Sequence, residues 1–341
     1  MLRCTLIVAM SFVCASSNQP TTNNLTDLAA PTRTNTTTTT TTTTSAGPHL
    51  VTFVAIQGPL PYVQTVTVNA DSLAVEVDRA PQVLQPNYRQ EAAMVTVGSR
   101  MYSIGAYDSP GECTVKPQNK GVEMYEHGQW TIQKSTNDGR WLAVVGYLSQ
   151  TGELFACSGQ SCEFRPEATD SKWTTQPLPE FQCIIDAAGV VHNNKIWISG
   201  GLDCPGNVTA RLTSFDGSTW TKYSPMRHAR YYHAMAANGD TLVVAGGHDA
   251  SGFYLSSCET YVPTIDAWLD MPSMTRPLEY INLFALGADR LVMFGGWSRN
   301  DTLYNHVDVF DKTKWFTAPG ASAVLNNRVG HFGATLLPTT D

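Results

Sequence analysis

Short apolar runs separated by turn residues recur along this chain of 341 residues, and three of them end in a glycine doublet. The doublets are Gly200-Gly201, Gly246-Gly247 and Gly295-Gly296, at intervals of 46 and 49 residues. Apolar and polar positions alternate within the runs, which is typical of strands, and Gly, Pro, Asn and Asp separate one run from the next. A repeat of this length fits a four-stranded sheet, so the pattern predicts an all-β repeat protein with very little helix.

Aromatic residues follow the doublets in a second repeated pattern. The pairs are Phe215 with Trp220, Tyr261 with Trp268, and Phe310 with Trp315. Two earlier segments keep the aromatic pair but have a degraded doublet: Tyr125 with Trp130, and Phe164 with Trp173. Glycine permits the positive φ and the close approach that a tight turn needs, while large rings fill the space between neighbouring sheets.

This succession of apolar strand, Gly-Gly, aromatic residue and tryptophan resembles the kelch repeat, in which each copy forms one blade of a β-propeller. A faint first copy that ends at Gly58 brings the number of repeats to six. We therefore expect residues 48–341 to form a six-bladed kelch-type β-propeller, closed by a C-terminal strand from residues 330–337 that completes the first blade. Because the first repeat lacks both Gly-Gly and Trp, five or seven blades remain open alternatives.

The first 47 residues differ in composition from the repeats. Residues 1–17 contain Arg3, an apolar run and the small-residue segment Cys14-Ala15-Ser16, an order that predicts a signal peptide. Residues 18–47 include nine consecutive threonines, so we expect a disordered Thr-rich linker, either an O-glycosylated stalk or a plain polar spacer. No other run reaches the length of a membrane span. We expect a secreted, extracellular protein without a transmembrane segment.

The cysteines and sequons fit an oxidising, extracellular setting. Six cysteines lie beyond the signal peptide, and we expect them to form disulfides: Cys113, Cys157, Cys162, Cys183, Cys204 and Cys258. Cys157 and Cys162 could join locally, whereas the other pairings are undetermined. Zinc needs two close Cys/His pairs and the sequence has one, so we expect no metal. Asn-x-Ser/Thr sequons predict a glycoprotein, with sites at Asn24, Asn35, Asn207 and Asn300.

Charge and motifs exclude several functions. The formal net charge is −7 and the chain has no block of Lys or Arg, which argues against nucleic acid as a partner. The sequence has no Gly-x-Ser-x-Gly, no Walker loop and no Gly-x-Gly-x-x-Gly. No cofactor is therefore expected, and the sequence favours a binding module over an enzyme.

Two enzyme alternatives rest on resemblance. The copper-radical oxidases similar to galactose oxidase use a cysteine-crosslinked tyrosine, a second tyrosine beside a histidine and another histidine, which Cys183, Tyr231, Tyr232-His233 and His331 could imitate. Neighbouring side chains of one strand point to opposite faces, so we interpret Tyr231, Tyr232 and His233 as ordinary repeat residues. The bacterial sialic acid epimerase shares the fold expectation but no motif that can be matched residue by residue.

Arginine recurs near the start of the expected inner strands and provides the binding hypothesis. The five positions are Arg89, Arg140, Arg230, Arg276 and Arg328. Some kelch domains bind acidic peptides with arginines at the rim, and guanidinium groups bind carboxylates with two hydrogen bonds. The alternative is that each arginine ties loops together through carbonyls and local carboxylates. We expect a recognition module for an extracellular protein or an anionic glycan, with these arginines as its ligand-binding residues.

Overall fold

The computed structural model describes twelve stretches of the chain. They are residues 50–54, 62–68, 72–78, 92–105, 120–140, 142–169, 171–178, 183–287, 289–299, 304, 306–318 and 334–336. The expected signal peptide, the Thr-rich linker, Asn24, Asn35 and Asn300 lie outside these residues. Among the described residues, the structure contains no helix with the length and apolar character needed to cross a bilayer.

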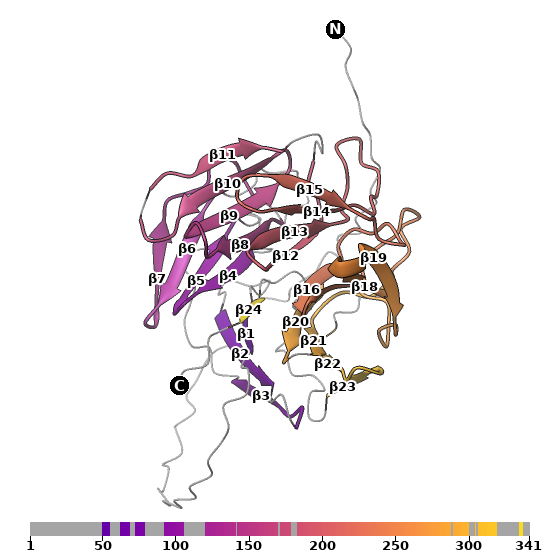
Figure 1. The fold of residues 1–341 in the computed structure, drawn as a ribbon. Helices are drawn as coiled ribbons and strands as arrows, with labels where there is room; N and C mark the ends of the chain where they lie inside the picture. Colours follow the sequence, from indigo (N-terminus) through magenta and orange to yellow (C-terminus); the bar gives the residue numbers. More distant parts are fainter. Residues whose placement is uncertain are drawn as a thin grey trace, which may run out of the picture. The chain divides into compact units, whose positions relative to one another are not determined.

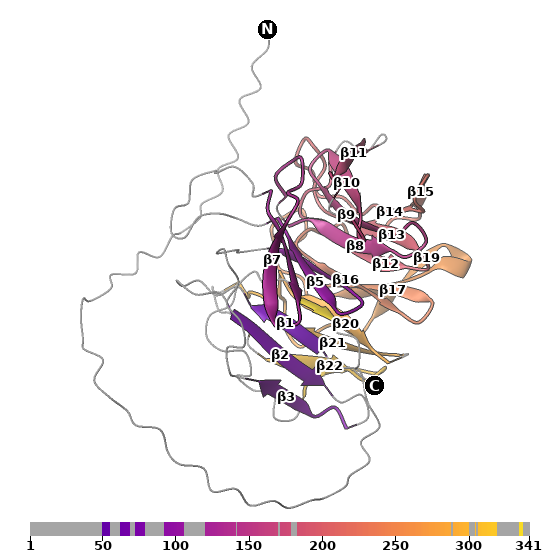
Figure 2. The ribbon, with the colours of Figure 1, turned by 90° about the vertical axis from the view of Figure 1, so that its left-hand side faces the viewer.

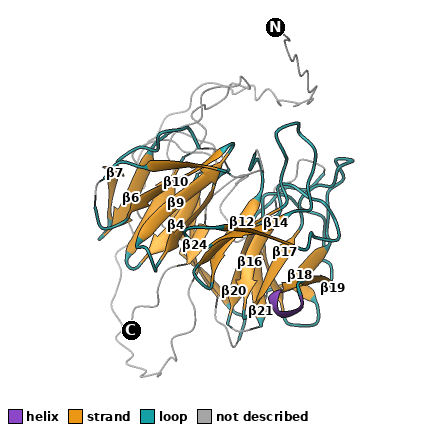
Figure 3. Ribbon diagram, turned by 45° about the horizontal axis from the view of Figure 1, so that its top comes forward, coloured by secondary structure: helices purple, strands orange, loops and turns teal. Residues whose placement is uncertain are grey.

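The described strands pair into six four-stranded antiparallel sheets (Figure 1). One sheet combines the C-terminal strand β24 (Ala334–Leu336) with β1 (Leu50–Val54), β2 (Tyr62–Val68) and β3 (Val75–Asp78). The next two sheets along the chain are β4 (Ala93–Val97), β5 (Arg100–Ile104), β6 (Val122–Glu126), β7 (Gln129–Gln133); and β8 (Val144–Leu148), β9 (Glu153–Ser158), β10 (Ser161–Pro166), β11 (Thr174–Pro177). The other three are β12 (Ala188–His192), β13 (Lys195–Ser199), β14 (Leu212–Phe215), β15 (Trp220–Tyr223); β16 (Ala234–Asn238), β17 (Thr241–Ala245), β18 (Cys258–Val262), β19 (Ala267–Met271); and β20 (Asn282–Leu286), β21 (Arg290–Phe294), β22 (Val307–Phe310), β23 (Trp315–Thr317). The helical content of the described ranges is one 3-10 helix, Pro263–Ile265, which lies between β18 and β19 (Figure 3).

Burial differs systematically from the first strand of a sheet to the last. The second strands β5, β9, β13, β17 and β21 begin with a half-buried residue and are buried from there to their ends. Their near-continuous apolar sequences, such as Leu242 to Ala245, fit strands that are covered on both faces. The last strands are largely exposed: β7 and β15 each bury no residue fully. The core of the protein therefore follows the second strands.

The repeated tryptophans pack within their own sheet and bond to the preceding one. Trp268 packs on Tyr261 with ring centroids 5.2 Å apart, and Trp315 packs on Phe310 at 5.4 Å. The Trp268 Nε1 atom donates a hydrogen bond to the Ser224 carbonyl (2.9 Å), and Trp315 Nε1 donates to the Pro272 carbonyl (3.2 Å). Each indole thus fills space with its ring and uses its single donor to tie two consecutive sheets together.

The expected count of six kelch blades is wrong, because five sheets are built as kelch blades. Sheets β4–β7, β8–β11, β12–β15, β16–β19 and β20–β23 each use one continuous repeat, and their first strands line a common cavity. The sheet β24-β1-β2-β3 takes its strands from two distant parts of the chain (Figure 2). Its segment lacks the Gly-Gly doublet and the tryptophan that shape the other sheets.

Strand β24 nevertheless occupies the position of the first strand in the sheet β24-β1-β2-β3. It runs antiparallel to β1, with Leu50 opposite Leu336 and Thr52 opposite Ala334. It also neighbours β4, as β4 neighbours β8 and β8 neighbours β12. The C-terminal strand therefore takes the innermost position of the composite sheet.

The cysteines form two disulfides among the described residues. Cys157 on β9 lies opposite Cys162 on β10, and these two are bonded as the sequence allows. Cys183 bonds with Cys204. The expectation that all six cysteines are paired is wrong for Cys258, which is a buried thiol on β18. Cys113 lies outside the described residues.

Candidate recognition site

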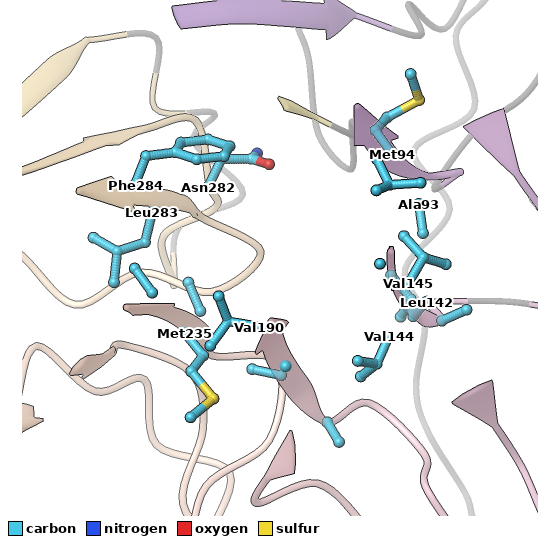
Figure 4. A pocket seen from close by; sticks show the side chains of 18 of the residues that line it. Ala93, Met94, Leu142, Val144, Val145, Val190, Met235, Asn282, Leu283 and Phe284 are labelled. Carbon is cyan, nitrogen blue, oxygen red and sulfur yellow. The ribbon is translucent and has the colours of Figure 1, made fainter. Parts of the chain in front are cut away.

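A cavity of about 620 Å³ lies between the first strands of the five kelch blades. Most of its lining residues are apolar, and Val144, Val190, Met235 and Leu283 are among them (Figure 4). Polar groups enter the lining through Asp186, Tyr232 and Tyr280, which precede the first strands β12, β16 and β20. The cavity thus has apolar walls and a polar end where the chain enters these strands.

The backbone at this polar end repeats from blade to blade. Tyr231 forms a β-bridge with His248, and Glu279 forms the equivalent bridge with Trp297. The residues that follow each bridge, Tyr232 and Tyr280, have positive φ values of 55° and 52°. The Tyr280 amide donates to the Tyr232 carbonyl at 3.0 Å, and the Tyr232 amide donates to the Asp186 carbonyl at 3.0 Å. Consecutive blades are therefore hydrogen-bonded to one another at the positions that carry the polar side chains.

The second glycine of each doublet is required by this backbone packing. Gly247 has φ +89°, and a Cβ at this position would lie 2.4 Å from the Tyr231 carbonyl oxygen and 2.8 Å from the His233 Cβ. Its amide donates to the Leu278 carbonyl of the next blade at 2.8 Å. A side chain here would displace the loop that holds Tyr231, so glycine is needed for close approach as well as for its φ.

Aromatic and charged side chains gather on this repeated backbone. Seven residues from three consecutive blades form the mouth cluster: Asp186, Tyr231, Tyr232, His248, Tyr254, Glu279 and Tyr280. Asp186 and Glu279 are each 7% exposed, whereas the tyrosines and His248 are half-buried. The cluster is consequently ordered by packing and remains partly exposed to solvent.

One half of the mouth cluster centres on Glu279. Its Oε2 atom lies 2.9 Å from His248 Nε2, and its Oε1 atom accepts a hydrogen bond from the Tyr254 hydroxyl at 3.1 Å. His248 Nδ1 is 3.4 Å from the Tyr231 hydroxyl, and the imidazole packs on the Tyr254 ring at 4.1 Å. The carboxylate thereby holds the Tyr254 phenol by a hydrogen bond and lies against the His248 imidazole.

The other half is a row of side chains across three blades. The Tyr232 hydroxyl is hydrogen-bonded to Asp186 and to Tyr280, and the Tyr232 and Tyr280 rings are 4.3 Å apart. Burial first, and then the Asp186 carboxylate, raise the pKa of Tyr232 well above its usual range. Burial and the neighbouring Tyr232 and Glu279 raise the pKa of Tyr280 in the same direction. Both phenols therefore remain neutral at physiological pH.

Two of the arginines predicted to bind a ligand are buried ties inside a blade. Arg230 is 0% exposed, and its guanidinium lies 2.7 Å from Glu259 Oε1 and donates to the carbonyls of Gly246 and Ser257, each at 3.0 Å. Arg140 is 1% exposed and is paired with the buried Glu163 in the same way. Each guanidinium is directed at a buried glutamate of its own blade. Arg140 and Arg230 therefore hold loops and strands together, which was the alternative interpretation of these arginines.

The remaining predicted arginines do not share this position. Arg276 is exposed, and its guanidinium lies 4.6 Å from the centre of the Tyr304 ring. The residue equivalent to Arg230 in that blade is Leu278, because Gly247 bonds to the Leu278 carbonyl as Gly201 bonds to the Arg230 carbonyl. Arg89 and Arg328 lie outside the described residues. The structure therefore does not gather the described arginines at one mouth.

The residues considered for a copper site are used differently. The Cys183 sulfur is bonded to Cys204 and cannot form a thioether with tyrosine. His233 is buried beside Ser199, with 2.8 Å between Nε2 and Oγ, and burial followed by the Arg230 charge holds its pKa well below the usual range. His331 lies outside the described residues. Within the described part of the chain, no group of three His, Cys, Asp or Glu side chains could hold a metal ion.

The sequence interpretation missed His248, Tyr254 and Glu279. A signal was present for His248, which directly follows the Gly246-Gly247 doublet and thus lies at a fixed place in the repeat. Glu279 belongs to the following repeat, and its contact with His248 depends on how two blades pack. Asn207, a predicted glycosylation site, is exposed, and its side-chain amide donates to Asp203 at 3.0 Å.

Comparison with known proteins is consistent with the repeat. The Kelch motif matches residues 229–275, which contain blade β16–β19. Kelch-like protein 36 of Bos taurus is 30% identical over 188 residues, covering 51% of this chain and 29% of that protein. Beta-scruin of Limulus polyphemus is 31% identical over 116 residues, covering 32% of this chain and 13% of that protein. The matches thus span less than a third of the length of these curated relatives.

A solved structure shares the fold. The structure of YjhT superposes with a TM-score of 0.62 at 13% sequence identity, covering 80% of this chain and 99% of that one. At this identity the likeness concerns the fold alone. The chain thus contains a Kelch motif, is similar to kelch-like and scruin proteins over part of their length, and has a β-propeller fold.

Proposed function

We propose that the protein is a secreted recognition module that binds an extracellular protein partner through the mouth cluster. Kelch propellers are typically protein-binding, and this chain has the kelch motif. The observation that carries the proposal is the gathering of four half-buried tyrosines, Tyr231, Tyr232, Tyr254 and Tyr280, two of which, Tyr232 and Tyr280, line the cavity. Tyrosine is enriched at protein interfaces because it offers a rigid apolar ring and a polar group at low entropic cost.

An exposed side chain at the edge of the mouth cluster is further evidence that this face binds a partner. Phe253 directly precedes Tyr254 and is 54% exposed. The Arg299 guanidinium lies 5.7 Å from its ring centre, so the edge offers an apolar ring and a cation side by side. Aromatic residues and arginine are the residue types that most often carry binding energy at interfaces.

Secretion is the second part of the proposal and rests on residues 1–17. Arg3, the apolar run and Cys14-Ala15-Ser16 have the order of a cleavable signal peptide. The bonded pairs Cys157–Cys162 and Cys183–Cys204 fit an oxidising compartment. Expression of the full chain in a eukaryotic secretory host should yield a protein in the medium whose N-terminus, read by mass spectrometry, begins near Ser17. An intracellular product that keeps Met1 would contradict this part.

Partner binding is tested with variants of the mouth cluster. Immobilised wild-type protein and the double variant Tyr231→Ala/Tyr254→Ala would be exposed to extracellular fluid, and the retained proteins identified and their affinities measured. We expect the double variant to lose the partner by at least a hundredfold in Kd, because two anchoring rings are removed. The control is Ile132→Ala, since Ile132 is 73% exposed on β7.

Two outcomes would overturn the proposal. A folded double variant that binds the same partner with unchanged affinity would exclude the mouth cluster as the recognition site. Loss of wild-type binding after enzymatic removal of glycans from the partner would show that the protein recognises a sugar rather than a polypeptide. Near-UV circular dichroism and thermal melting of each variant establish that the fold is intact.

A further inference from the structure

The rings of the mouth cluster pack against one another and form a continuous aromatic surface. The Tyr231 and Tyr232 ring centres are 4.7 Å apart, and the Tyr232 and Tyr280 centres are 4.3 Å apart. Both Tyr232 and Tyr280 line the cavity. The faces of aromatic rings carry negative electrostatic potential and attract organic cations.

Carboxylates act on the same rings. The pKa of Tyr231 is raised by burial first, and then by the negative charges of Glu279, Asp186 and Asp249. Asp186 also raises the pKa values of Tyr232 and Tyr280. Two carboxylates that are each 7% exposed therefore add their negative potential to that of the rings, in surroundings where water screens it less than at the surface.

The two arginines near the cluster do not cancel this potential. Arg299, over the Phe253 ring at the edge, is exposed, so solvent screens its charge. Arg230 precedes Tyr231 directly, but its guanidinium is paired at 2.7 Å with the buried Glu259. His248 lies beside Glu279 and is 12% exposed at its side chain. His248 Nε2 lies 2.9 Å from one carboxylate oxygen of Glu279, and the Tyr254 hydroxyl donates to the other. A carboxylate oxygen can accept two hydrogen bonds, so a ligand ammonium can bond to Glu279 beside these groups.

The geometry points to a cation site: we propose that the mouth cluster receives a lysine or arginine side chain of the partner protein. The charged head lies over the aromatic surface that Tyr231, Tyr232 and Tyr280 form together, and it reaches Asp186 and Glu279. The aliphatic stem packs along the rings and toward Phe253 at the edge. This inference rests on the proposed function, and it replaces the anionic ligand expected from the sequence, because Arg140 and Arg230 are turned inward while carboxylates lie at the mouth.

The direct test uses single-residue probes on the full mature protein. N-acetyl-lysine methylamide and N-acetyl-arginine methylamide would be titrated into protein labelled with fluorinated tyrosine and followed by fluorine NMR. We expect saturable shifts of the tyrosine signals with Kd values in the millimolar range, which corresponds to about −4 kcal/mol for one side chain. N-acetyl-norleucine methylamide, which has a similar stem without the charge, should bind at least tenfold more weakly.

Matched variants connect the binding to the two carboxylates. Glu279→Gln and Asp186→Asn keep the shape and an acceptor oxygen but remove the charge, and each should weaken cation binding about tenfold. The control Asp270→Asn changes an exposed carboxylate on β19 that pairs with Arg227, and it should leave binding unchanged. Glu279→Gln keeps the inference testable if Asp186→Asn unfolds the protein.

The possible results separate this inference from the proposed function. Equal binding of the norleucine and lysine probes, or stronger binding of N-acetyl-glutamate methylamide, would overturn the cation site. If the partner is still lost in Tyr231→Ala/Tyr254→Ala, the proposed function would stand without it. Partner binding that is weakened about tenfold by Glu279→Gln, together with binding of the cationic probes, would support both.

Discussion

At the scale of single residues, Arg230 shows how a charged side chain can serve the fold rather than the site. Arg230 and Glu259 are 0% and 1% exposed and 2.7 Å apart. Replacing Arg230 by Met leaves Glu259 buried without its partner, which we expect to lower the free energy of unfolding by about 3–5 kcal/mol. Chemical denaturation of the purified protein measures this change.

A matched control uses an arginine three positions earlier. Arg227 pairs with Asp270 at 2.6 Å, but both side chains are more than half exposed. Arg227→Met should therefore change stability by no more than about 1 kcal/mol. Equal stability of the Arg230→Met and wild-type proteins would show that the buried pair is not a structural tie.

The thiol of Cys258 provides a second prediction at this scale. Burial raises the pKa of this thiol to about 12, so the reactive thiolate is scarce at pH 8. We expect iodoacetamide to leave Cys258 unmodified in the native protein and to alkylate it after unfolding in guanidinium. Peptide mapping by mass spectrometry reads the site directly. Rapid native modification, or a disulfide at Cys258, would contradict the structure.

At the scale of the element, the glycine doublet determines how a strand turns toward the next blade. Gly247 and Gly252 both have positive φ, +89° and +73°, but a Cβ on Gly252 would meet nothing within 4 Å. Gly247→Ala should therefore be less stable than Gly252→Ala by about 1–3 kcal/mol, because only the first brings a Cβ against the Tyr231 carbonyl. Melting temperatures compare the two. Equal destabilisation would mean that φ alone requires glycine.

The composite sheet gives the second prediction for an element. Strand β24 pairs with β1 through Leu50–Leu336, Val51–Thr335 and Thr52–Ala334. Deleting residues 334–341 exposes the edge of β1, and we expect a secreted yield reduced at least tenfold and an oligomeric product, since unpaired edges promote aggregation. Deleting only 338–341 is the control. A monomeric truncated protein with the wild-type melting temperature would show that this pairing is dispensable.

Features within one repeat could be predicted from the sequence, whereas contacts between blades could not. The doublets and tryptophans predicted four-stranded blades because turn geometry and ring packing are local requirements of each repeat. Arg276 was wrongly taken as the equivalent of Arg230 in blade β20–β23. The equivalent residue there is Leu278, and Asp308 stands where blade β16–β19 has Glu259. The pairing of the C-terminal strand with the first segment was predicted correctly, but the count of six kelch blades was wrong because that segment lacks the Gly-Gly doublet and the tryptophan of the other five. The His248–Glu279 contact crosses two blades, and no local pattern encodes it.

At the scale of the whole molecule, the five kelch blades share a backbone framework and differ in the side chains at one end of the cavity. Asp186, Tyr232 and Tyr280 occupy equivalent positive-φ positions, yet one is an acid and two are phenols. The equivalent bridges place Tyr231 in one blade and Glu279 in the next. Variation at fixed positions on a rigid framework gives recognition without changing the fold.

The most direct test of this account is site-specific photo-crosslinking in extracellular fluid. A photoreactive phenylalanine analogue would replace Phe253 at the edge of the mouth cluster, and in a second protein it would replace Ile132 on β7, which is 73% exposed. The account predicts a covalent complex from position 253, suppressed in the Tyr231→Ala/Tyr254→Ala background, and none from position 132. Crosslinking from position 132 alone, or from position 253 without dependence on the two tyrosines, would contradict recognition through the mouth cluster.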